Sequence, residues 1–507
     1  MSDCTWSFAR VGAWSLLFSC AHDTAGHAAH TSASSDQTSL ALSISQIATT
    51  VLGVVLGMWV LLSPWMIYGS WLHWLSWRYR NSGPRRPAQP LPLPHVTVQL
   101  PVFNEENVIA RLLNSVGKLD WPAELLQIQL LDDSTDRTPE IAAPIIDRLR
   151  ATGQTIAHIR RTDRQGYKAG ALSSALPSAT GEFILILDAD FVPESNLLRQ
   201  LMPWFVDPRI AFAQGRWGHL APPVSLIERT AGYWIDRHLE IEQVARSRSG
   251  QFFNFNGSGG VWRRSAIDDA GGWSADTITE DLDISLRAWQ RGWKFIFDFD
   301  AVVPAEIPSN AASLRIQQRR WARGAFQVAR LAIPQLASEP LRDRITISLQ
   351  LTGYLAPILF LALALTSGLV AWARLYHPSL GFYAGDLPML GFFLPIVSQV
   401  LRQAHKAGLR RAWLEFEAVA LGIALVPLAV KAGYEGLRTF GGVFERTPKS
   451  TRAAGQMPGI VFVELTLGLL CIANAVWAMV LGAPWIAPLP ILAGAGLLAF
   501  AWRTVWP

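Results

Sequence analysis

A long run without Asp, Glu, Lys or Arg, Ala41–Trp77, limits the possible folds of this chain more than any other feature. It exceeds the ~20 apolar residues that a helix needs to cross a bilayer. Half of the 507 residues are hydrophobic, and we expect further spans at Leu349–Trp372, Ala418–Ala432, Ile460–Leu481 and Trp485–Ala501. Glu464 and Lys431 lie at the margins of two of these segments. We therefore predict a multi-pass membrane protein rather than the three or four soluble domains that the length would allow.

Basic residues directly after the first apolar run predict how the chain is oriented. Arg78, Arg80, Arg85 and Arg86 follow that run, and the positive-inside rule keeps such residues in the cytoplasm. The polar part of the chain that comes next is then expected on the cytoplasmic face of the inner (plasma) membrane.

Composition argues against several other classes of protein. The formal net charge of +5 fits basic loop residues at membrane edges. Because no basic stripe with interleaved aromatic residues occurs, a nucleic acid is not an expected partner. The three cysteines lack the spacing of a zinc site or a disulfide framework. They are Cys4, Cys20 and Cys471. Cys4 and Cys20 could form a disulfide with each other or remain free thiols.

Changes in composition along the chain predict four regions. Residues 1–40 are expected to be a disordered or signal-like tail, and residues 41–82 a membrane anchor with its basic flank. A proline-rich stretch then opens a cytoplasmic domain at 83–335, because repeated prolines cannot continue a helix. Residues 336–507 are expected to form a C-terminal membrane bundle with a cytoplasmic loop at 434–456.

Within the cytoplasmic region, apolar strand patterns alternate with helical ones. We expect strands at His95–Leu100, Leu126–Leu131, Ile156–Ile159, Phe183–Leu187 and Lys294–Phe299, and helices at Glu105–Leu119 and Asp136–Arg150. This alternation predicts an α/β domain with a mostly parallel sheet that is covered on both faces. Ligands bind such sheets at the carboxyl ends of the strands.

Pairs of acids follow two of these strands. Asp132 and Asp133 come after the second strand, where one of them is expected to bind a nucleotide and the alternative is plain helix capping. Asp188 and Asp190 end the most hydrophobic strand. Two carboxylates that close together repel each other unless a cation lies between them. Mg²⁺ or Mn²⁺ suits this place, since these ions take one or two carboxylates together with phosphate oxygens.

Two glycine-containing segments carry candidates for binding the rest of a nucleotide sugar. Lys168 stands at the start of a predicted helix whose first N–H groups can meet a phosphate, with a surface lysine as the alternative. The segment Phe252–Arg263 combines aromatic residues, amides and three glycines. Asn256 and Gly257 within it are expected to bind an acceptor sugar.

A third acidic pair begins a later helix. Glu280 and Asp281 precede the helical segment 282–291, so one of them could simply be a first-turn charge. Asp281 is the candidate general base, with Glu280 beside it in the catalytic site, because a displacement needs a carboxylate to take the proton of the attacking hydroxyl. Asp283 is expected to be a helix-face charge.

A basic and aromatic helix precedes the C-terminal spans. Gln317, Arg320 and Trp321 share one side of it by their spacing. Trp321 is expected to line the acceptor site with Gln317, while Arg320 faces a diphosphate. The alternative is a basic amphipathic helix on the membrane surface, built on Arg315, Arg319 and Arg323.

Taken together, these motifs resemble the family 2 inverting glycosyltransferases of the cellulose synthase superfamily. Leu131–Asp136, Gly166–Leu172 and Gly257–Arg263 are most similar to the mannan and xyloglucan-backbone synthase-like members. The resemblance implies a GT-A-type domain in which matching residues bind the nucleotide, hold the metal, act as the base and line the acceptor channel. Phe444–Lys449 resembles the gating loop of these synthases. That loop must stay cytoplasmic, so we interpret Leu387–Leu401 as re-entrant or interfacial rather than a full span.

The function expected from the sequence is metal-dependent, inverting and processive transfer of a hexose to a growing β-linked polysaccharide. UDP-glucose or GDP-mannose is the expected donor. A glycolipid transferase acting on a ceramide or diacylglycerol acceptor would use the same domain and is the first alternative. A non-catalytic scaffold is the second, although every acid and the Trp that chemistry requires are present.

Overall fold

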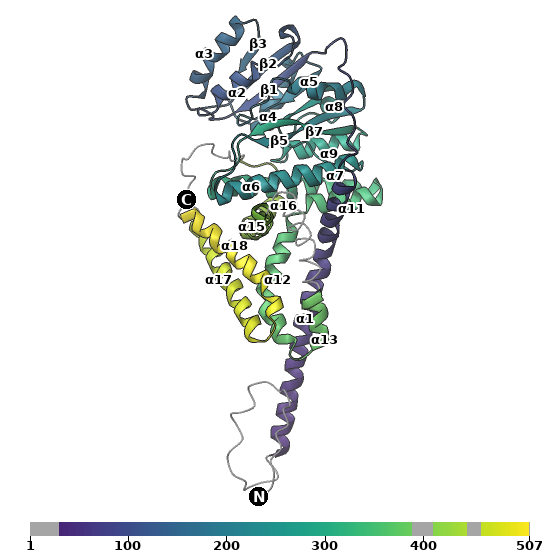
Figure 1. Cartoon of the computed structure of the whole chain (residues 1–507), viewed down its shortest axis with the longest axis vertical. Coiled ribbons are helices and arrows are strands. Elements are labelled where there is room, and N and C mark those ends of the chain that lie inside the picture. Colours follow the sequence, from purple (N-terminus) through teal and green to yellow (C-terminus); the bar gives the residue numbers. More distant parts are fainter. Residues whose placement is uncertain (1–29, 388–408, 444–457, 506–507) are drawn as a thin grey trace.

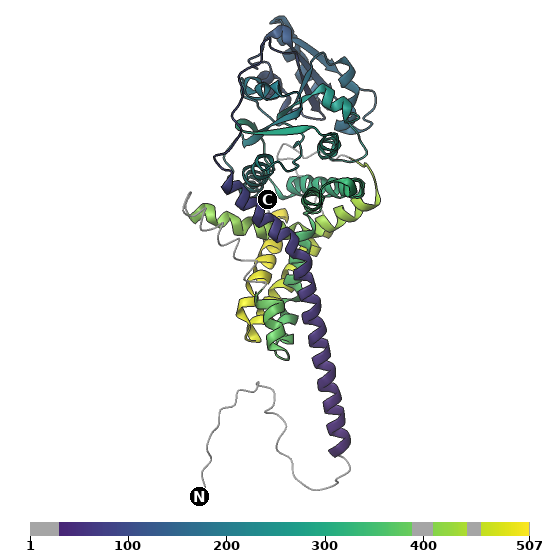
Figure 2. The same cartoon turned by 90° about the vertical axis from the view of Figure 1, so that its right-hand side faces the viewer.

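The computed structural model describes residues 30–387, 409–443 and 458–505. An α/β domain lies at one end, and a group of long helices extends away from it (Figure 1). The first of these helices, α1 (His30–Arg78), leaves the α/β domain and runs beyond all the others (Figure 2). It begins ten residues before the tail was predicted to end, so the part of that tail from His30 onward is helical rather than disordered.

Seven strands form one sheet in the order β3-β2-β1-β4-β6-β5-β7. Their bounds are β1 Val96–Val102, β2 Leu126–Asp132, β3 Thr155–Ile159, β4 Phe183–Ile186, β5 Ile210–His219, β6 Gly260–Arg263 and β7 Lys294–Ala305. The pairings β1·β2, β1·β4, β2·β3 and β5·β7 are parallel. The prediction of a mostly parallel α/β sheet is therefore confirmed.

Strand β6 is the exception, because it runs antiparallel to both β4 and β5. Its first residue, Gly260, lies opposite Ile186 of β4 and Gln214 of β5. A β-carbon on Gly260 would lie 2.8 Å from the backbone oxygen of Ala213, so only glycine fits between these strands. Strand β6 was not predicted from the sequence, because it has only four residues and no alternating pattern.

Helices cover both faces of the sheet. On one face α2 (Ile109–Val116) and α3 (Thr138–Ala151) bury apolar residues against β1 and β2, and on the other α4 (Tyr167–Ala175) packs in a second core. Helix α2 begins four residues later than predicted, because Asn104 adopts a left-handed φ of 55° and the next residues form a turn. The turn is held by the bond that the Glu105 N–H donates to Thr138 Oγ1 at 2.8 Å.

Within the described residues, four helices are long and apolar enough to cross a membrane: α1, α12 (Leu355–Ala373), α17 (Pro458–Val480) and α18 (Pro488–Val505). The segment expected at Ala418–Ala432 is not a straight span. It is divided between α15 (Leu409–Ala424) and α16 (Val426–Arg438), which meet at 50° just before Pro427. Counting that bent pair as one span gives five.

Helix α10 (Ala311–Ala332) joins the α/β domain to the long helices. Arg315 on α10 and Glu464 on α17 are each only 1 % exposed, and their side chains lie 2.7 Å apart. Arg319 forms a second pair with Glu435 on α16 at 3.0 Å. The predicted margin residue Glu464 is therefore a buried partner, and these arginines bind other helices instead of forming a free membrane-surface face.

Three other predictions lie outside the described residues. They concern Cys4 and Cys20, nearly all of Leu387–Leu401, and the gate-like segment Phe444–Lys449.

Candidate active site

A cavity of about 170 Å³ lies at the carboxyl end of the sheet. It brings together residues from segments that are far apart in the sequence. All but one of the predicted site residues line it: Asp133, Lys168, Asp188, Asp190, Asn256, Gly257, Glu280, Asp281, Gln317, Arg320 and Trp321.

Asp132 is the predicted site residue that the cavity does not include. It is 1 % exposed, and its carboxylate binds His158 Nε2 at 2.8 Å and accepts the Ser134 N–H at 2.9 Å. Burial alone would raise the pKa of Asp132, but these hydrogen bonds outweigh it and lower the pKa. Its nucleotide-binding assignment is therefore replaced by a structural role in fixing the turn after β2, while Asp133 beside it faces the cavity and pairs with Arg161.

The acids after β4 meet Lys168 in this cavity. Lys168 Nζ lies 2.6 Å from Asp188 Oδ1 and 3.5 Å from Glu280 Oε1, and it donates to the Gly257 carbonyl at 2.9 Å. Burial would lower the pKa of Lys168, but Asp188 and Glu280 raise it overall, so the amine stays positive. With a side chain only 12 % exposed, Lys168 is not the surface lysine considered as an alternative.

The predicted base stands at the beginning of α9 (Glu280–Gln290). Burial, and after it the charge of Glu280, raise the pKa of Asp281 to about 7. One of its oxygens accepts the Leu282 N–H at 2.9 Å. A β-carbon on Gly257 would lie only 2.8 Å from the other carboxylate oxygen of Asp281, and Gly257 has a left-handed φ of 84°. Only glycine therefore allows the backbone to approach this carboxylate so closely.

The neighbouring acid Asp283 has a different role. Its carboxylate pairs with Arg287 one turn later at 2.7 Å, outside the cavity. The prediction of a helix-face charge is confirmed.

Helix α10 supplies the cationic and aromatic wall. Gln317, Arg320 and Trp321 all line the cavity. Burial lowers the pKa of Arg320, and the carboxylates of Asp188 and Glu280 oppose that shift. The guanidinium is thus buried among the acids from β4 and α9, although it comes from a helix that begins beyond β7.

A second cavity, of about 550 Å³, adjoins the first. The two share Asn256, Asp281, Gln317 and Trp321. From there the second cavity extends past Tyr354 to Leu425, which lies between α15 and α16, and to Leu428 on α16. Asp281 consequently lies where a space at the sheet edge meets a space that leads toward the long helices.

Sequence reasoning missed several residues in the walls. Trp217 on β5 faces both cavities, and Trp234 on α6 (Leu226–Arg237) and Arg246 on α7 (Val244–Arg248) face the second. No periodicity or motif marks these positions. For Trp217 the available signal was the glycine-rich segment before β6, which its side chain contacts. Trp217 donates its indole N–H to the Ser258 carbonyl in that segment at 2.9 Å.

The carboxylates suit a hard divalent cation that a ligand completes. No group of three or more His, Cys, Asp or Glu able to hold a metal occurs among the residues that the structure describes. Asp188 and Asp190 offer two carboxylates, the number that Mg²⁺ commonly takes from protein when substrate phosphates fill the remaining positions. The donor set therefore fits a cation that arrives with a diphosphate.

Comparison with known proteins agrees with this geometry. The family described as glycosyl transferase family group 2 matches residues 183–400. Glucomannan 4-beta-mannosyltransferase 2 of Arabidopsis thaliana is 39% identical over 248 residues, which cover 48% of this chain and 46% of that protein. Probable glucomannan 4-beta-mannosyltransferase 11 of Oryza sativa subsp. japonica is 41% identical over 236 residues, covering 46% and 41%. The matched part thus spans less than half the length of either relative.

Among solved structures, the mannosyltransferase PcManGT from Pyrobaculum calidifontis in complex with GDP-Man and Mn²⁺ is similar, with a TM-score of 0.48 and 22% identity. The match covers 77% of this chain and 99% of that one. The part of this chain at 183–400 is therefore similar to the glycosyl transferase family group 2, and it contains Asp188, Asp190, Asp281 and Arg320 of the cavity.

Proposed function

We propose that this protein transfers a hexose from a nucleoside diphosphate sugar to a hydroxyl of a β-linked polysaccharide, with inversion at the anomeric carbon. Mannose is the first candidate, because the curated relatives are named as mannosyltransferases. The observation that carries the proposal is the place of Asp281, at the junction of a charged cavity and a longer one.

The charged cavity suits a nucleoside diphosphate. Lys168 and Arg320 are two buried cations that face the acids of β4 and α9. Asp188 and Asp190 would hold Mg²⁺ or Mn²⁺, and such an ion, when bound, neutralises the charge that develops on the leaving diphosphate. Lys168 then serves two partners, because its three N–H bonds allow it to keep Asp188 while donating to a phosphate oxygen.

Asp281 suits the acceptor side of a direct displacement. The acceptor hydroxyl oxygen forms a bond to the anomeric carbon, the bond from that carbon to the diphosphate oxygen breaks, and its electron pair leaves with the nucleotide. The hydroxyl proton passes to Asp281. A carboxylate with a pKa raised to about 7 is a stronger base than an ordinary one, and a base is most effective when its pKa lies near the working pH.

The second cavity suits the growing chain. Trp217, Trp234 and Trp321 present aromatic surfaces along it, and Asn254 and Asn256 add amides. Aromatic faces and amides together recognise the apolar and hydroxyl-bearing surfaces of a sugar ring. Its far end, near Leu425 and Leu428, is apolar. That end also fits the lipid chain of a glycolipid acceptor, which is the second candidate function.

The apolar helices also support a location for the protein. The four or five apolar helices support placement in a membrane, and Arg78 and Arg80 at the end of α1 support a cytoplasmic catalytic domain at the plasma membrane.

Turnover by the full chain in lipid nanodiscs tests the proposal. The protein would be supplied with radiolabelled GDP-mannose or UDP-glucose and with Mg²⁺, Mn²⁺ or a chelator, and the products would be sized. We expect a polymer that a β-mannanase degrades, formed only with metal. A product extractable into organic solvent would support the glycolipid function instead. No turnover of either donor would reject both.

A further inference from the structure

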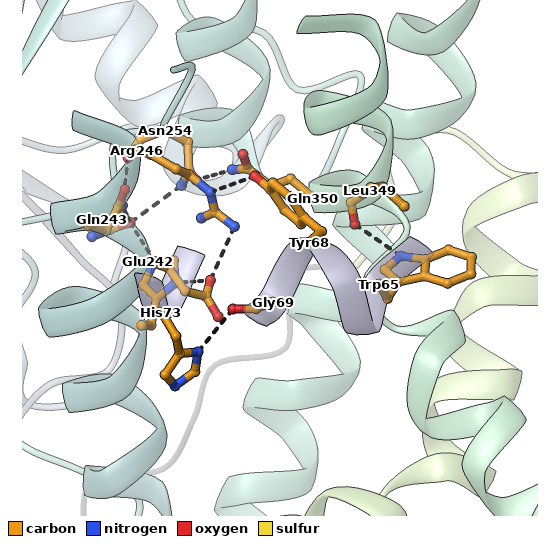
Figure 3. Close-up of polar contacts among 12 residues, drawn as sticks. Trp65, Tyr68, Gly69, His73, Glu242, Gln243, Arg246, Asn254, Leu349 and Gln350 are labelled. Atoms are coloured by element: carbon orange, nitrogen blue, oxygen red, sulfur yellow. Dashed lines mark hydrogen bonds and ion pairs between the residues drawn. The ribbon is translucent and has the colours of Figure 1, made fainter. Parts of the chain in front are cut away.

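A chain of hydrogen-bonded amides, of which Gln243 is buried and the others are half-buried, leads to Asn256, where the two cavities meet (Figure 3 labels its members Gln243, Asn254 and Gln350). Gln243 is fully buried and lines neither cavity. Its Nε2 donates to the Asn254 carbonyl at 3.1 Å and to Asn256 Oδ1 at 2.9 Å. These contacts decide whether the oxygen or the NH₂ group of the Asn256 amide faces the cavities.

Backbone carbonyls fix the orientation of the amides, because a carbonyl can only accept a hydrogen bond. Since the Asn254 carbonyl faces Gln243, the side chain of Gln243 must present its NH₂ group there. The Phe255 carbonyl accepts from Asn254 Nδ2 at 2.8 Å and fixes the Asn254 amide in the same way. Both amides then donate N–H groups to Asn256 Oδ1. Gln243 Nε2 lies 2.9 Å from this oxygen, and Asn254 Nδ2 lies 3.4 Å from it. Asn256 must therefore present its oxygen to the protein.

The opposite end of Asn256 consequently carries the donors. Asn256 Nδ2 is buried and has no hydrogen-bond partner among the described residues. Because a buried N–H without a partner is costly, such a group normally has one in the functional complex. Asn256 stands in the wall that both cavities share with Asp281.

The elements behind this network are held in place. Glu242 lies beside Gln243 in the π-helical turn η4 (His238–Gln243), a form that often occurs at functional sites. Its carboxylate pairs with Arg246 at 3.2 Å, and Arg246 Nε donates to the Tyr68 hydroxyl on α1 at 3.2 Å (Figure 3). From the other side, Gln350 on α11 (Leu341–Leu351) donates to Asn254 Oδ1 at 3.1 Å.

We propose that Gln243 is a positioning residue that fixes the Asn256 amide so that its Nδ2 donates to a ring or hydroxyl oxygen of the acceptor sugar beside Asp281. This inference rests on the proposed function, since it assigns a contact to that acceptor. Gln243 itself touches no substrate and acts through Asn256.

Acceptor kinetics test the inference in the full chain in nanodiscs, with GDP-mannose as donor and β-1,4-mannotetraose as acceptor. Gln243→Met keeps the shape of the side chain and removes both donors. We expect the acceptor KM to rise about 10-fold, the effect of losing one well-placed hydrogen bond. Donor hydrolysis without acceptor reports the charged cavity, and we expect it to change less than about twofold.

A double-mutant cycle separates positioning from a merely structural role. In an Asn256→Ala background, Gln243→Met is expected to add less than about twofold to the acceptor KM, because the two residues act through one contact. The matched control is Gln251→Met: Gln251 is also a buried glutamine, but it binds Ser249 rather than Asn256. This control should leave the acceptor KM unchanged.

Three results would overturn the inference. The first is an acceptor KM for Gln243→Met equal to that of the original chain. The second is that Gln243→Met raises the acceptor KM as much in the Asn256→Ala background as it does alone. The third is that Gln251→Met raises the acceptor KM as much as Gln243→Met does. The first would also mean that only water partners Asn256 Nδ2. If Gln243→Met does not fold, Gln243→Leu carries the same expectation. Absence of any GDP-mannose turnover by the original chain would instead reject the proposed function.

Discussion

The two cavities that meet at Asp281 are built on different principles. The sheet-edge cavity is lined by acids and by two buried cations, and its charges neutralise one another, as in the 2.6 Å contact of Lys168 with Asp188. The longer cavity is lined mainly by aromatic, amide and apolar side chains, and its main ion pair, Glu242 with Arg246, is internal to the protein.

The difference concerns what each cavity can bind. Buried charges are tolerated only when they are paired, so a set of paired charges can exchange one partner for a charged ligand. A neutral wall instead recognises a neutral ligand by surface contact and hydrogen bonds. Changes in the first cavity should therefore act on turnover and metal dependence, and changes in the second on the affinity for the acceptor.

The strongest test of this division is Asp281→Asn. The amide keeps the size of the side chain but cannot take a proton, so we expect transfer to fall on the order of 10³-fold. Nucleotide affinity, measured by calorimetry, should remain nearly unchanged. Asp283→Asn on the same helix is the matched control, because Asp283 pairs with Arg287 outside the cavity. A large loss of nucleotide binding in Asp281→Asn would reject the base assignment.

Asp190→Ala tests whether the charged cavity depends on a cation. Removing one of the two carboxylates after β4 should weaken metal binding and lower activity by about 100-fold, with little remaining response to added Mg²⁺ or Mn²⁺. Activity would be titrated with each metal and with a chelator. Asp300→Ala, at an exposed carboxylate on β7, serves as the control. Full activity of Asp190→Ala in chelator would contradict the metal assignment.

The pH dependence of kcat/KM sharpens the comparison further. Asp281 must be deprotonated to act, and burial raises its pKa to about 7. Activity should therefore fall about 10-fold for each pH unit below that value and level off above it. The profile would be measured at saturating metal between pH 5 and 9. A profile that stays flat down to pH 5 would show that an ordinary carboxylate acts instead.

The smallest expected effect belongs to the neutral wall. Trp234→Leu removes an aromatic face from the second cavity, and we expect the acceptor KM to rise about 3- to 10-fold with donor hydrolysis unaffected. Initial rates against mannotetraose concentration would measure it. Trp293→Leu is the control, since Trp293 bonds to Asp269 away from both cavities. A comparable loss of donor hydrolysis in Trp234→Leu would mean that the cavities are not functionally separate.

Much of the charged cavity was predictable from the sequence, because its acids follow recognisable strands. Asp188 and Asp190 come directly after β4, and Glu280 and Asp281 begin a clearly amphipathic helix. Asp132 shows the limit of this reasoning. Two adjacent acids at a strand end look alike in sequence, and only the structure shows that Asp132 binds His158 on the neighbouring strand β3 while Asp133 lines the cavity.

The neutral cavity was largely unpredictable, since its walls come from tertiary packing. Trp234 and Arg246 lie on helices with no motif, and the buried state of Gln243 depends on the turn around Asn254. The bend between α15 and α16 and the antiparallel β6 were missed for the same reason: neither has a repeating pattern long enough to reveal it.

The Arg315–Glu464 pair has a practical consequence for dissecting this molecule. A fragment cut after residue 335 would retain every acid of the charged cavity yet leave Arg315, now 1 % exposed, without its carboxylate partner. Helix α10, which carries Arg320 and Trp321, would then lose its anchor on α17. Activity measured on such a fragment would come from a distorted site, so a preparation that keeps α10 together with α17 is needed.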